Sequence, residues 1–387
     1  MTESVYNKRE SRPGTRKIDR TRLKRNHDKP GQRYRFLIQS AFSLLCLWLG
    51  VEFYFFIRYL ETNGASGWTY RPPGVEGFLP ISSLMSLYHF FISGEIHPAH
   101  PAGLVILVAI LLVSLLFGKA FCSWLCPVGF ISELLGHISR VVFKRNLKLP
   151  GILDYPLRGI KYLLLGFFIY SIFFLMTPPA LEAFLGSPYN LVADIKMYYF
   201  FAEISQTALL VIGGLLLLSL IFRNFWCRYL CPYGALLGIL ALLSPNRIKR
   251  NAPNCIDCGR CARVCPSFIK VDKVKTVISD ECTTCLQCVE VCPVKETLEY
   301  QSLLTRRPFP VKKVALGVVL LFIVITGMGM VTGLWRNNIT TDEYLHHQKY
   351  LKSYSHPTGT GEIMDYNQRA GSGEAKSKPW EKETDNE

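Results

Sequence analysis

One cysteine pattern, present twice, restricts the fold of this chain more than any other feature of its 387 residues. The pattern is Cys-x2-Cys-x2-Cys-x3-Cys-Pro, and it occupies residues 255–266 and again residues 282–293. Three cysteines at such short intervals wrap a loop around one corner of a metal cluster, and each thiolate binds a different metal atom. The chain on either side must therefore fold so that both sets of sulfur atoms are held in place.

The pattern matches the bacterial ferredoxin signature for a pair of 4Fe–4S clusters, in which the fourth cysteine of each copy binds the cluster of the other copy. By that rule, the first cluster is bound by Cys255, Cys258, Cys261 and Cys292. The second cluster is bound by Cys282, Cys285, Cys288 and Cys265. Paired Cys-x2-Cys units also bind zinc, but zinc motifs rarely have the third cysteine and the Cys-Pro ending in both copies. The sequence therefore favours two iron–sulfur clusters over two zinc sites.

Apolar and charged residues are segregated along the chain. The mean hydropathy is +0.20, although the chain has 44 Lys plus Arg and 29 Asp plus Glu. The apolar residues are concentrated in segments 36–57, 102–118, 162–178, 204–222 and 314–335. A helix of about 20 apolar residues crosses the hydrocarbon core of a bilayer, and the middle three segments are short for this. The sequence predicts a mainly α polytopic membrane protein of about five spans with an inserted α+β two-cluster ferredoxin domain.

These features divide the chain into five parts. Residues 1–35 are expected to form a basic disordered tail, and residues 36–250 a membrane domain with four spans. The double 4Fe–4S ferredoxin domain follows at 251–301, the fifth span lies within 302–335, and a polar, mobile external tail occupies 336–387. Two shorter apolar stretches, 78–93 and 233–244, are expected to be interfacial or re-entrant.

The distribution of basic residues predicts how the chain crosses the membrane. Twelve Lys or Arg precede the first span, two lie in the next loop, seven in 119–161, one in 179–203 and fifteen in 223–313. Loops rich in Lys and Arg stay in the cytoplasm. The N-terminus and the ferredoxin domain are therefore expected to be cytoplasmic, and the C-terminal tail periplasmic or external. The net charge of +15 indicates contact with membrane lipid, and no nucleic-acid partner is expected.

A second cysteine motif, Cys-x3-Cys-Pro-x-Gly, occurs twice at an offset of 105 residues. Its cysteines are Cys122 and Cys126 in one copy, and Cys227 and Cys231 in the other. Cysteines four residues apart share a helix face, and the repeat indicates a pseudo-symmetric bundle in which four thiols meet. These four residues are candidates for an extra metal or redox site, against the alternative of small buried side chains that only pack. An iron–sulfur centre, a dithiol pair and a copper site all remain open.

Two further features lie in the predicted external region. The loop 71–80 is too apolar and too rich in turn-forming residues to be a plain linker, so it is expected to fold back on the protein. His97 and His100 follow it. Both are candidates for binding a metal or a quinol, although single histidines at such positions are more often simply solvated.

With these motifs in view, the chain resembles the bacterial membrane polyferredoxins, the family of the ferredoxin-type quinol dehydrogenase component of periplasmic nitrate reduction. It is most similar to a small electron transport protein within that family. The likeness extends over about residues 71–300 and rests on residues 77–81, 121–127, 226–233 and 255–293. It implies a multi-pass protein of the bacterial inner membrane with two cytoplasmic 4Fe–4S clusters and a redox partner protein. This chain differs from shorter relatives by its fifth span and its long tail.

The expected function is to relay electrons between the quinone pool or a redox partner and the two clusters. The chain would then act as a quinol dehydrogenase or as the electron-transfer subunit of a larger oxidoreductase system. The alternative is a redox-active assembly or regulatory factor for a respiratory metalloenzyme. No nucleotide-binding motif or catalytic nucleophile is evident in the sequence.

Overall fold

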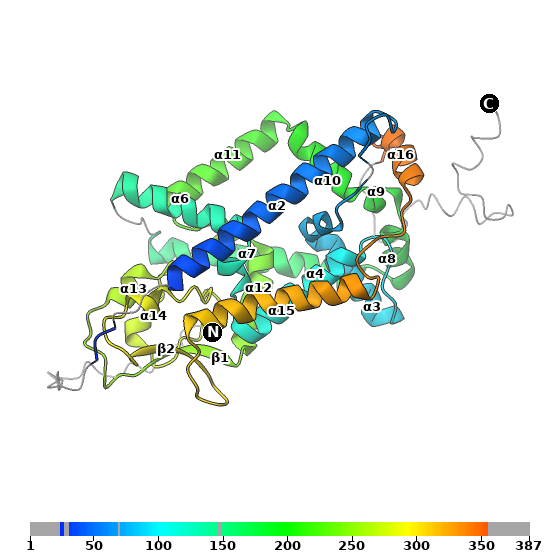
Figure 1. Ribbon diagram of the computed structural model, residues 1–387. Helices are drawn as coiled ribbons and strands as arrows, with labels where there is room; N and C mark the ends of the chain where they lie inside the picture. The colour runs from blue at the N-terminus through cyan, green and yellow to red at the C-terminus, as the bar shows by residue number, and fades with distance from the viewer. Residues whose placement is uncertain (1–23, 27–30, 69, 145–148, 355–387) are drawn as a thin grey trace, which may run out of the picture. The chain divides into compact units, whose positions relative to one another are not determined.

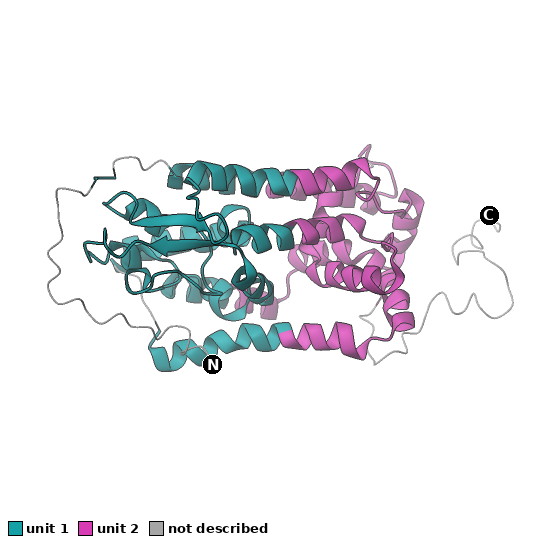
Figure 2. Ribbon diagram, turned by 90° about the horizontal axis from the view of Figure 1, so that it is seen from below, with its two compact units in different colours: residues 1–45, 110–165, 213–323 teal, residues 46–109, 166–212, 324–387 magenta. Residues whose placement is uncertain are grey.

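The computed structural model describes residues 24–26, 31–68, 70–144 and 149–354. Most of the tail predicted to be disordered, 1–35, lies outside these residues. The described chain is mainly helical, as predicted, and it divides into two compact units (Figures 1 and 2). Unit 1 comprises 1–45, 110–165 and 213–323, and unit 2 comprises 46–109, 166–212 and 324–387.

Three helical segments in the described chain are long and apolar enough to cross a membrane. They are α2 (Gly31–Glu61), α7 (Gly151–Tyr170) with its continuation η3 (Ser171–Leu175), and α15 (Val311–Val331). A fourth candidate is the pair α10 (Ala193–Ala202) and α11 (Gln206–Ile221), which is bent by 82°. The remaining predicted span, α4 (Pro101–Phe117), has 17 residues and is roughly 26 Å long, short of the ~30 Å needed. The prediction of five spans is therefore not confirmed.

Unit 1 contains both cysteine motifs. After α4 come α5 (Phe121–Trp124) and α6 (Pro127–Phe143), and after α11 come η4 (Trp226–Leu230) and α12 (Pro232–Leu243). The ferredoxin region then contains β1 (Asn246–Arg250), α13 (Arg260–Val264), η5 (Val271–Lys273), α14 (Gln287–Val291) and β2 (Leu298–Ser302). The two strands pair antiparallel, with Arg250 opposite Leu298 and Asn246 opposite Ser302. This pairing joins the chain before the first motif to the chain after the second.

Unit 2 is helical and has an apolar core. It contains η2 (Pro73–Phe78), α3 (Pro80–Ser93), α8 (Pro178–Leu185), α9 (Pro188–Leu191) and α16 (Thr341–Tyr350). Phe56 and Tyr344 pack edge to face in the core, with ring centroids 5.5 Å apart. The loop 71–80 is folded, as predicted, because buried Arg71 forms ion pairs with Asp194 at 2.7 Å and Glu76 at 3.0 Å.

The described part of the C-terminal tail does not match the prediction of a mobile segment. Helix α16 begins after Thr340, whose side chain accepts a hydrogen bond from the Glu343 amide at 3.2 Å. Tyr344 is only 2% exposed, and its ring lies 5.7 Å from the Arg71 guanidinium. The buried ring of Tyr344 beside the Arg71 cation holds this polar segment against the rest of unit 2. Residues 355–387 lie outside the described chain.

Candidate functional site

The four cysteines assigned to the first cluster line one pocket. Cys255, Cys258, Cys261 and Cys292 all contribute to its wall, together with Asp272. Gly259 has φ +66°, a left-handed conformation that glycine adopts without strain, and α13 begins directly after it. Helix α13 ends before Cys265, whose backbone is extended, and Pro266 prevents continuation of the helix. The local turn and the short helix thus direct three cysteines to one pocket and send the fourth elsewhere.

The second ferredoxin motif, residues 282–293, has the same local structure as the first. Leu286 takes the place of Gly259 with φ +58°, α14 begins at Gln287, and the helix ends at Cys292 in an extended conformation. Cys265, Cys285 and Cys288 are buried. Cys265 interacts electrostatically with Cys285 and Cys282, and Cys288 interacts with all three of these thiols. The structure therefore brings together the second predicted set of four cysteines as well.

Each group suits an iron–sulfur cluster by its chemistry. Both consist of four soft sulfur donors, and the first group faces a pocket. Among the described residues, no three His, Cys, Asp or Glu side chains are placed to hold a single metal ion. The fit to a cluster rests on the donor type and on the exchange of the fourth cysteine between the two motifs.

Helices of unit 1 hold the loop of the second motif through its backbone. The Ser123 hydroxyl donates to the carbonyl oxygen of Thr283 at 2.6 Å, and the Trp124 indole donates to that of Thr284 at 3.1 Å. The Gln32 amide on α2 donates to the carbonyl oxygen of Cys285 at 3.0 Å. Buried carbonyl groups need such donors, so these three side chains determine where the loop can lie.

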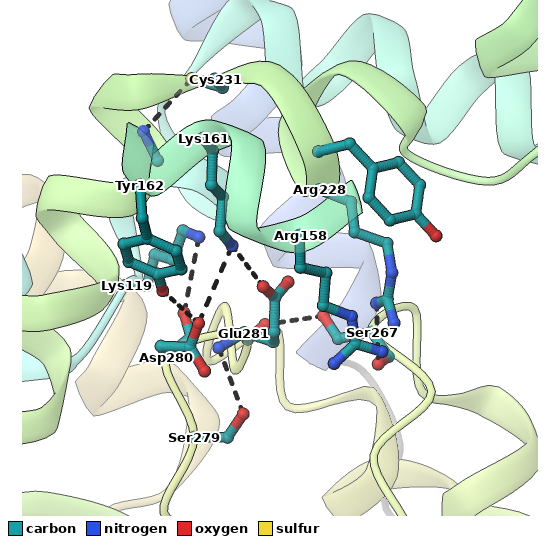
Figure 3. Close-up of polar contacts among 12 residues, drawn as sticks. Lys119, Arg158, Lys161, Tyr162, Arg228, Cys231, Ser267, Ser279, Asp280 and Glu281 are labelled. Carbon is teal, nitrogen blue, oxygen red and sulfur yellow. Dashed lines mark hydrogen bonds and ion pairs between the residues drawn. The ribbon is translucent and has the colours of Figure 1, made fainter. Parts of the chain in front are cut away.

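Buried charges connect α7 to the residues directly before the second ferredoxin motif, and η4 to the segment between the two motifs (Figure 3). Lys161, which is fully buried, forms an ion pair with Glu281 and lies 3.8 Å from the Asp280 carboxylate. Arg228 pairs with Asp154 at 3.1 Å and donates to the carbonyl oxygen of Ser267 at 3.1 Å. Sequence reasoning missed these residues, because the basic residues of these loops were used only to predict orientation. The sequence feature that could have indicated these contacts is the acidic pair Asp280 and Glu281, directly before Cys282.

Each copy of the Cys-x3-Cys-Pro motif lies at the start of a helix. Cys126 is the N-cap of α6 and Cys231 is the N-cap of α12, each with proline at the first helical position. The Cys231 sulfur accepts a hydrogen bond from the Gly234 amide at 3.2 Å (Figure 3). A Cβ atom at the matching Gly129 would overlap the carbonyl oxygen of Cys122. The overlap explains the glycine in the first copy of the motif, whereas a Cβ atom at Gly234 would lie 3.5 Å from its nearest neighbours.

The four thiols of the two Cys-x3-Cys-Pro copies lie near one another. Cys126 interacts electrostatically with Cys122, Cys227 and Cys231. Burial raises the pKa of Cys122 to about 11 and that of Cys227 to about 12. These thiols are therefore protonated at neutral pH, unless a bound metal displaces the protons. The structure brings together the four residues that the sequence grouped.

The histidines predicted as candidates differ in their surroundings. His100 is buried, and its Nε2 lies 2.6 Å from the carbonyl oxygen of Asn190. Its Nδ1 lies 3.6 Å from a Glu76 oxygen. His97 accepts a hydrogen bond from the Ala99 amide at 3.3 Å. His100 is therefore part of the buried polar network around Arg71 and is not a solvated side chain.

Comparison with known proteins identifies the family. A model described as a 4Fe-4S dicluster domain matches residues 247–300, and one described as a 4Fe-4S binding domain matches residues 99–150 and 204–251. No solved structure matches the chain. It is 42% identical over 352 residues to "Putative electron transport protein YccM" of Escherichia coli, covering 89% of this chain and 97% of that protein.

More distant relatives share the central part. The chain is 29% identical over 234 residues to "Protein NirI" of Paracoccus denitrificans, covering 57% of this chain and 33% of that protein. It is 27% identical over 198 residues to "Ferredoxin-type protein NapH" of Haemophilus influenzae, covering 49% of this chain and 64% of that protein. With its two cysteine sets in place and a relative similar over almost its whole length, this chain is an iron–sulfur electron transport protein of the membrane polyferredoxin family.

Proposed function

We propose that this protein relays electrons between the quinone pool, or a membrane redox partner, and two 4Fe–4S clusters. Cys255, Cys258, Cys261 and Cys292 bind one cluster, and Cys265, Cys282, Cys285 and Cys288 bind the other. When bound, each cluster supplies a one-electron couple, and a pair of them suits the two electrons that quinol oxidation releases. The observation that carries the proposal is the gathering of both cysteine sets in unit 1, with the second loop held by residues of α2 and α5.

We also propose that the ferredoxin region and the N-terminus lie in the cytoplasm. The start of α2 lies beside the second ferredoxin motif, because the Gln32 backbone amide donates to the Glu290 carboxylate at 2.8 Å and the Gln32 side chain donates to the carbonyl oxygen of Cys285 at 3.0 Å. The start of α15 is close to the same place, since a Cβ atom at Gly31 would lie 2.8 Å from Val311. Two candidate spans thus begin beside the ferredoxin region, which supports one common side for the N-terminus and this region. Reporter fusions at each terminus test the sidedness.

We further propose that Cys122, Cys126, Cys227 and Cys231 bind an additional thiolate-ligated redox centre. Their mutual proximity and the two helix N-termini beneath Cys126 and Cys231 support it, because helix N-termini stabilise thiolates. Spectroscopic loss of a third signal in Cys122→Ala or Cys227→Ala, with no loss in the control Cys46→Ala, is the expected result. If neither substitution removes a signal or a metal, the four thiols only pack.

The experiment that tests the main proposal is redox-titrated electron paramagnetic resonance on anaerobically purified full-length protein. We expect about eight iron atoms per chain from the two ferredoxin motifs and two reduced-cluster signals. A quinol analogue or a partner should reduce the clusters rapidly. Colourless, iron-free protein would contradict the proposal.

A second candidate is a redox-active assembly or regulatory factor. One relative carries the name "Regulatory protein NosR" in Pseudomonas aeruginosa, with 28% identity over 55% of this chain and 29% of that protein. A factor of this kind would change its affinity for a partner with the oxidation state of its clusters. Binding measurements on oxidised and reduced protein separate it from a relay, whose partner affinity need not change.

A further inference from the structure

Arg223 is a buried cation without a counter-charge of its own. It follows α11, is only 4% exposed, and within the described chain its Nε has no hydrogen-bond partner. Burial of a charged guanidinium is strongly unfavourable unless an anion compensates it. The position is nevertheless built to hold it. A Cβ atom at Gly136 on α6 would lie 3.2 Å from Arg223 Cγ, so the glycine allows the arginine side chain to pack closely against this helix.

The neighbouring carboxylate is already neutralised. Glu133 attracts Arg223, but the two Glu133 oxygens lie 2.6 and 2.5 Å from the guanidinium of Arg35. Gln287 adds a third donor to Glu133 at 3.1 Å. Arg140 lies on the same side and repels Arg223. The pair of Arg35 and Glu133 is thus neutral as a whole, and the charge of Arg223 remains uncompensated among the described residues.

Hydrogen bonds bring the chain at Arg223 and the second cysteine set to the same part of α6. Asn224, the next residue, accepts from the Ser132 hydroxyl at 3.1 Å, and Gln287, between Cys285 and Cys288, donates to Glu133 at 3.1 Å. Arg223 interacts electrostatically with Cys265 and Cys285, two of the four thiols assigned to one cluster. A 4Fe–4S cluster with four thiolates is an anion, and it gains one more negative charge on reduction. A buried cation stabilises the reduced form more than the oxidised form, because attraction grows with charge and is weakly screened away from water.

The first cysteine set has different surroundings. Its pocket is lined by two arginines, half-buried Arg250 and exposed Arg260, and by Asp272, which carries the opposite charge. The Nε atom of Arg250 donates to the carbonyl oxygen of Val274 at 3.0 Å. An exposed arginine is screened by water and salt, and it contributes little to a nearby charge. The two sets therefore have similar local loops but different electrostatic surroundings.

We propose that Arg223 is a counter-cation that raises the reduction potential of the cluster bound by Cys265, Cys282, Cys285 and Cys288. The inference rests on the proposed function, since it needs that cluster to be present. It makes the two clusters unequal. Arg223 favours residence of the electron on the cluster held by the second loop, beside α5 and the start of α2.

The test is a redox titration of full-length, cluster-loaded protein by electron paramagnetic resonance. The signal that is lost in the Cys258→Ser variant is the one that belongs to the first cysteine set. We expect Arg223→Met to shift the midpoint potential of the other signal to a more negative value and to leave the first signal unchanged. Arg223→Lys keeps the charge and should restore most of the potential. Arg260→Met removes an exposed arginine and is the matched control, with no shift in the second signal.

Glu133→Gln provides a test of the opposite sign that does not need the Arg223→Met variant to fold. It leaves Arg35 uncompensated, so the same signal should move to a more positive potential. If both clusters are present and neither Arg223→Met nor Glu133→Gln moves the second signal, the inference fails while the proposed function stands. Absence of iron from the unaltered protein would instead contradict the proposed function.

Discussion

Lys161 on α7 forms an ion pair with Glu281, the residue directly before the first cysteine of the second motif. Lys161 is fully buried, and Glu281 is only 6% exposed. The Tyr162 hydroxyl donates to the Asp280 carboxylate beside it (Figure 3). A helix that is a candidate membrane span is thereby connected to the loop that presents the second cysteine set, so the stability of the loop depends on charges far from it in sequence.

Loss of the Lys161 charge should destabilise the protein. Lys161→Met removes the ion-pair partner of buried Glu281, and breaking a buried pair typically costs about 3–5 kcal/mol. The expected result is a lower midpoint in chemical unfolding and early loss of one cluster signal. The control is Lys273→Met, because Lys273 is 66% exposed and 3.6 Å from Asp272, so its removal should cost at most about 1 kcal/mol. Equal effects of the two substitutions would contradict the structural role of Lys161.

The Trp124 indole should matter for its hydrogen bond as well as for its volume. Trp124→Phe keeps an aromatic ring but leaves the carbonyl oxygen of Thr284 without this donor, at a cost of about 1–3 kcal/mol. Hydrogen exchange should then become faster in the loop 282–288. Trp48→Phe on the exposed face of α2 is the control and should leave exchange there unchanged. Unaltered exchange in Trp124→Phe would show that other contacts hold the loop.

Gly129 should tolerate no side chain. Gly129→Ala places a Cβ atom against the carbonyl oxygen of Cys122, and the overlap should cost about 1–3 kcal/mol or more. Gly213→Ala is the matched control, since no atom lies within 4 Å of a Cβ atom there and alanine favours the helix. Thermal unfolding of the two variants measures the difference. A destabilisation by Gly213→Ala as large as that by Gly129→Ala would argue against the overlap.

Unit 2 should lose stability in mild acid. Burial, together with the nearby His346, lowers the pKa of His347 from 6.5 to about 4. The unfolded chain therefore binds a proton below pH 6.5 that the folded chain binds only near pH 4. This stability is complete above pH 6.5 and is lost as the pH falls through that window, by up to about 3 kcal/mol.

His347→Gln should flatten this dependence. Limited proteolysis of the C-terminal region between pH 7 and pH 4 measures it, with the unaltered protein becoming more sensitive as the pH falls. Burial also lowers the pKa of His97 to about 4, so part of the dependence should remain in the variant. An unchanged pH profile in His347→Gln would mean that His347 does not contribute.

Long-range contacts corrected several sequence predictions. The polar segment from residue 336 indicated a mobile tail, because its composition shows no apolar periodicity. Tyr344 is buried there because Phe56 and Arg71, both distant in sequence, pack against its ring. His100 was expected to be solvated, yet it is enclosed by Asn190 and Glu76. In each case the partner lies on another element, so local sequence has no sign of it.

The sequence by itself determined the two ferredoxin motifs, the mainly helical class and the grouping of the cysteines. Ligand spacing is a local property, because a few residues of covalent chain set how far apart two sulfur atoms can reach. Only the tertiary structure decided which charges meet those sulfur atoms. The pairing of Lys161 with Glu281 and the approach of Arg223 to Cys265 depend on how helices pack, and burial makes these interactions strong by removing water.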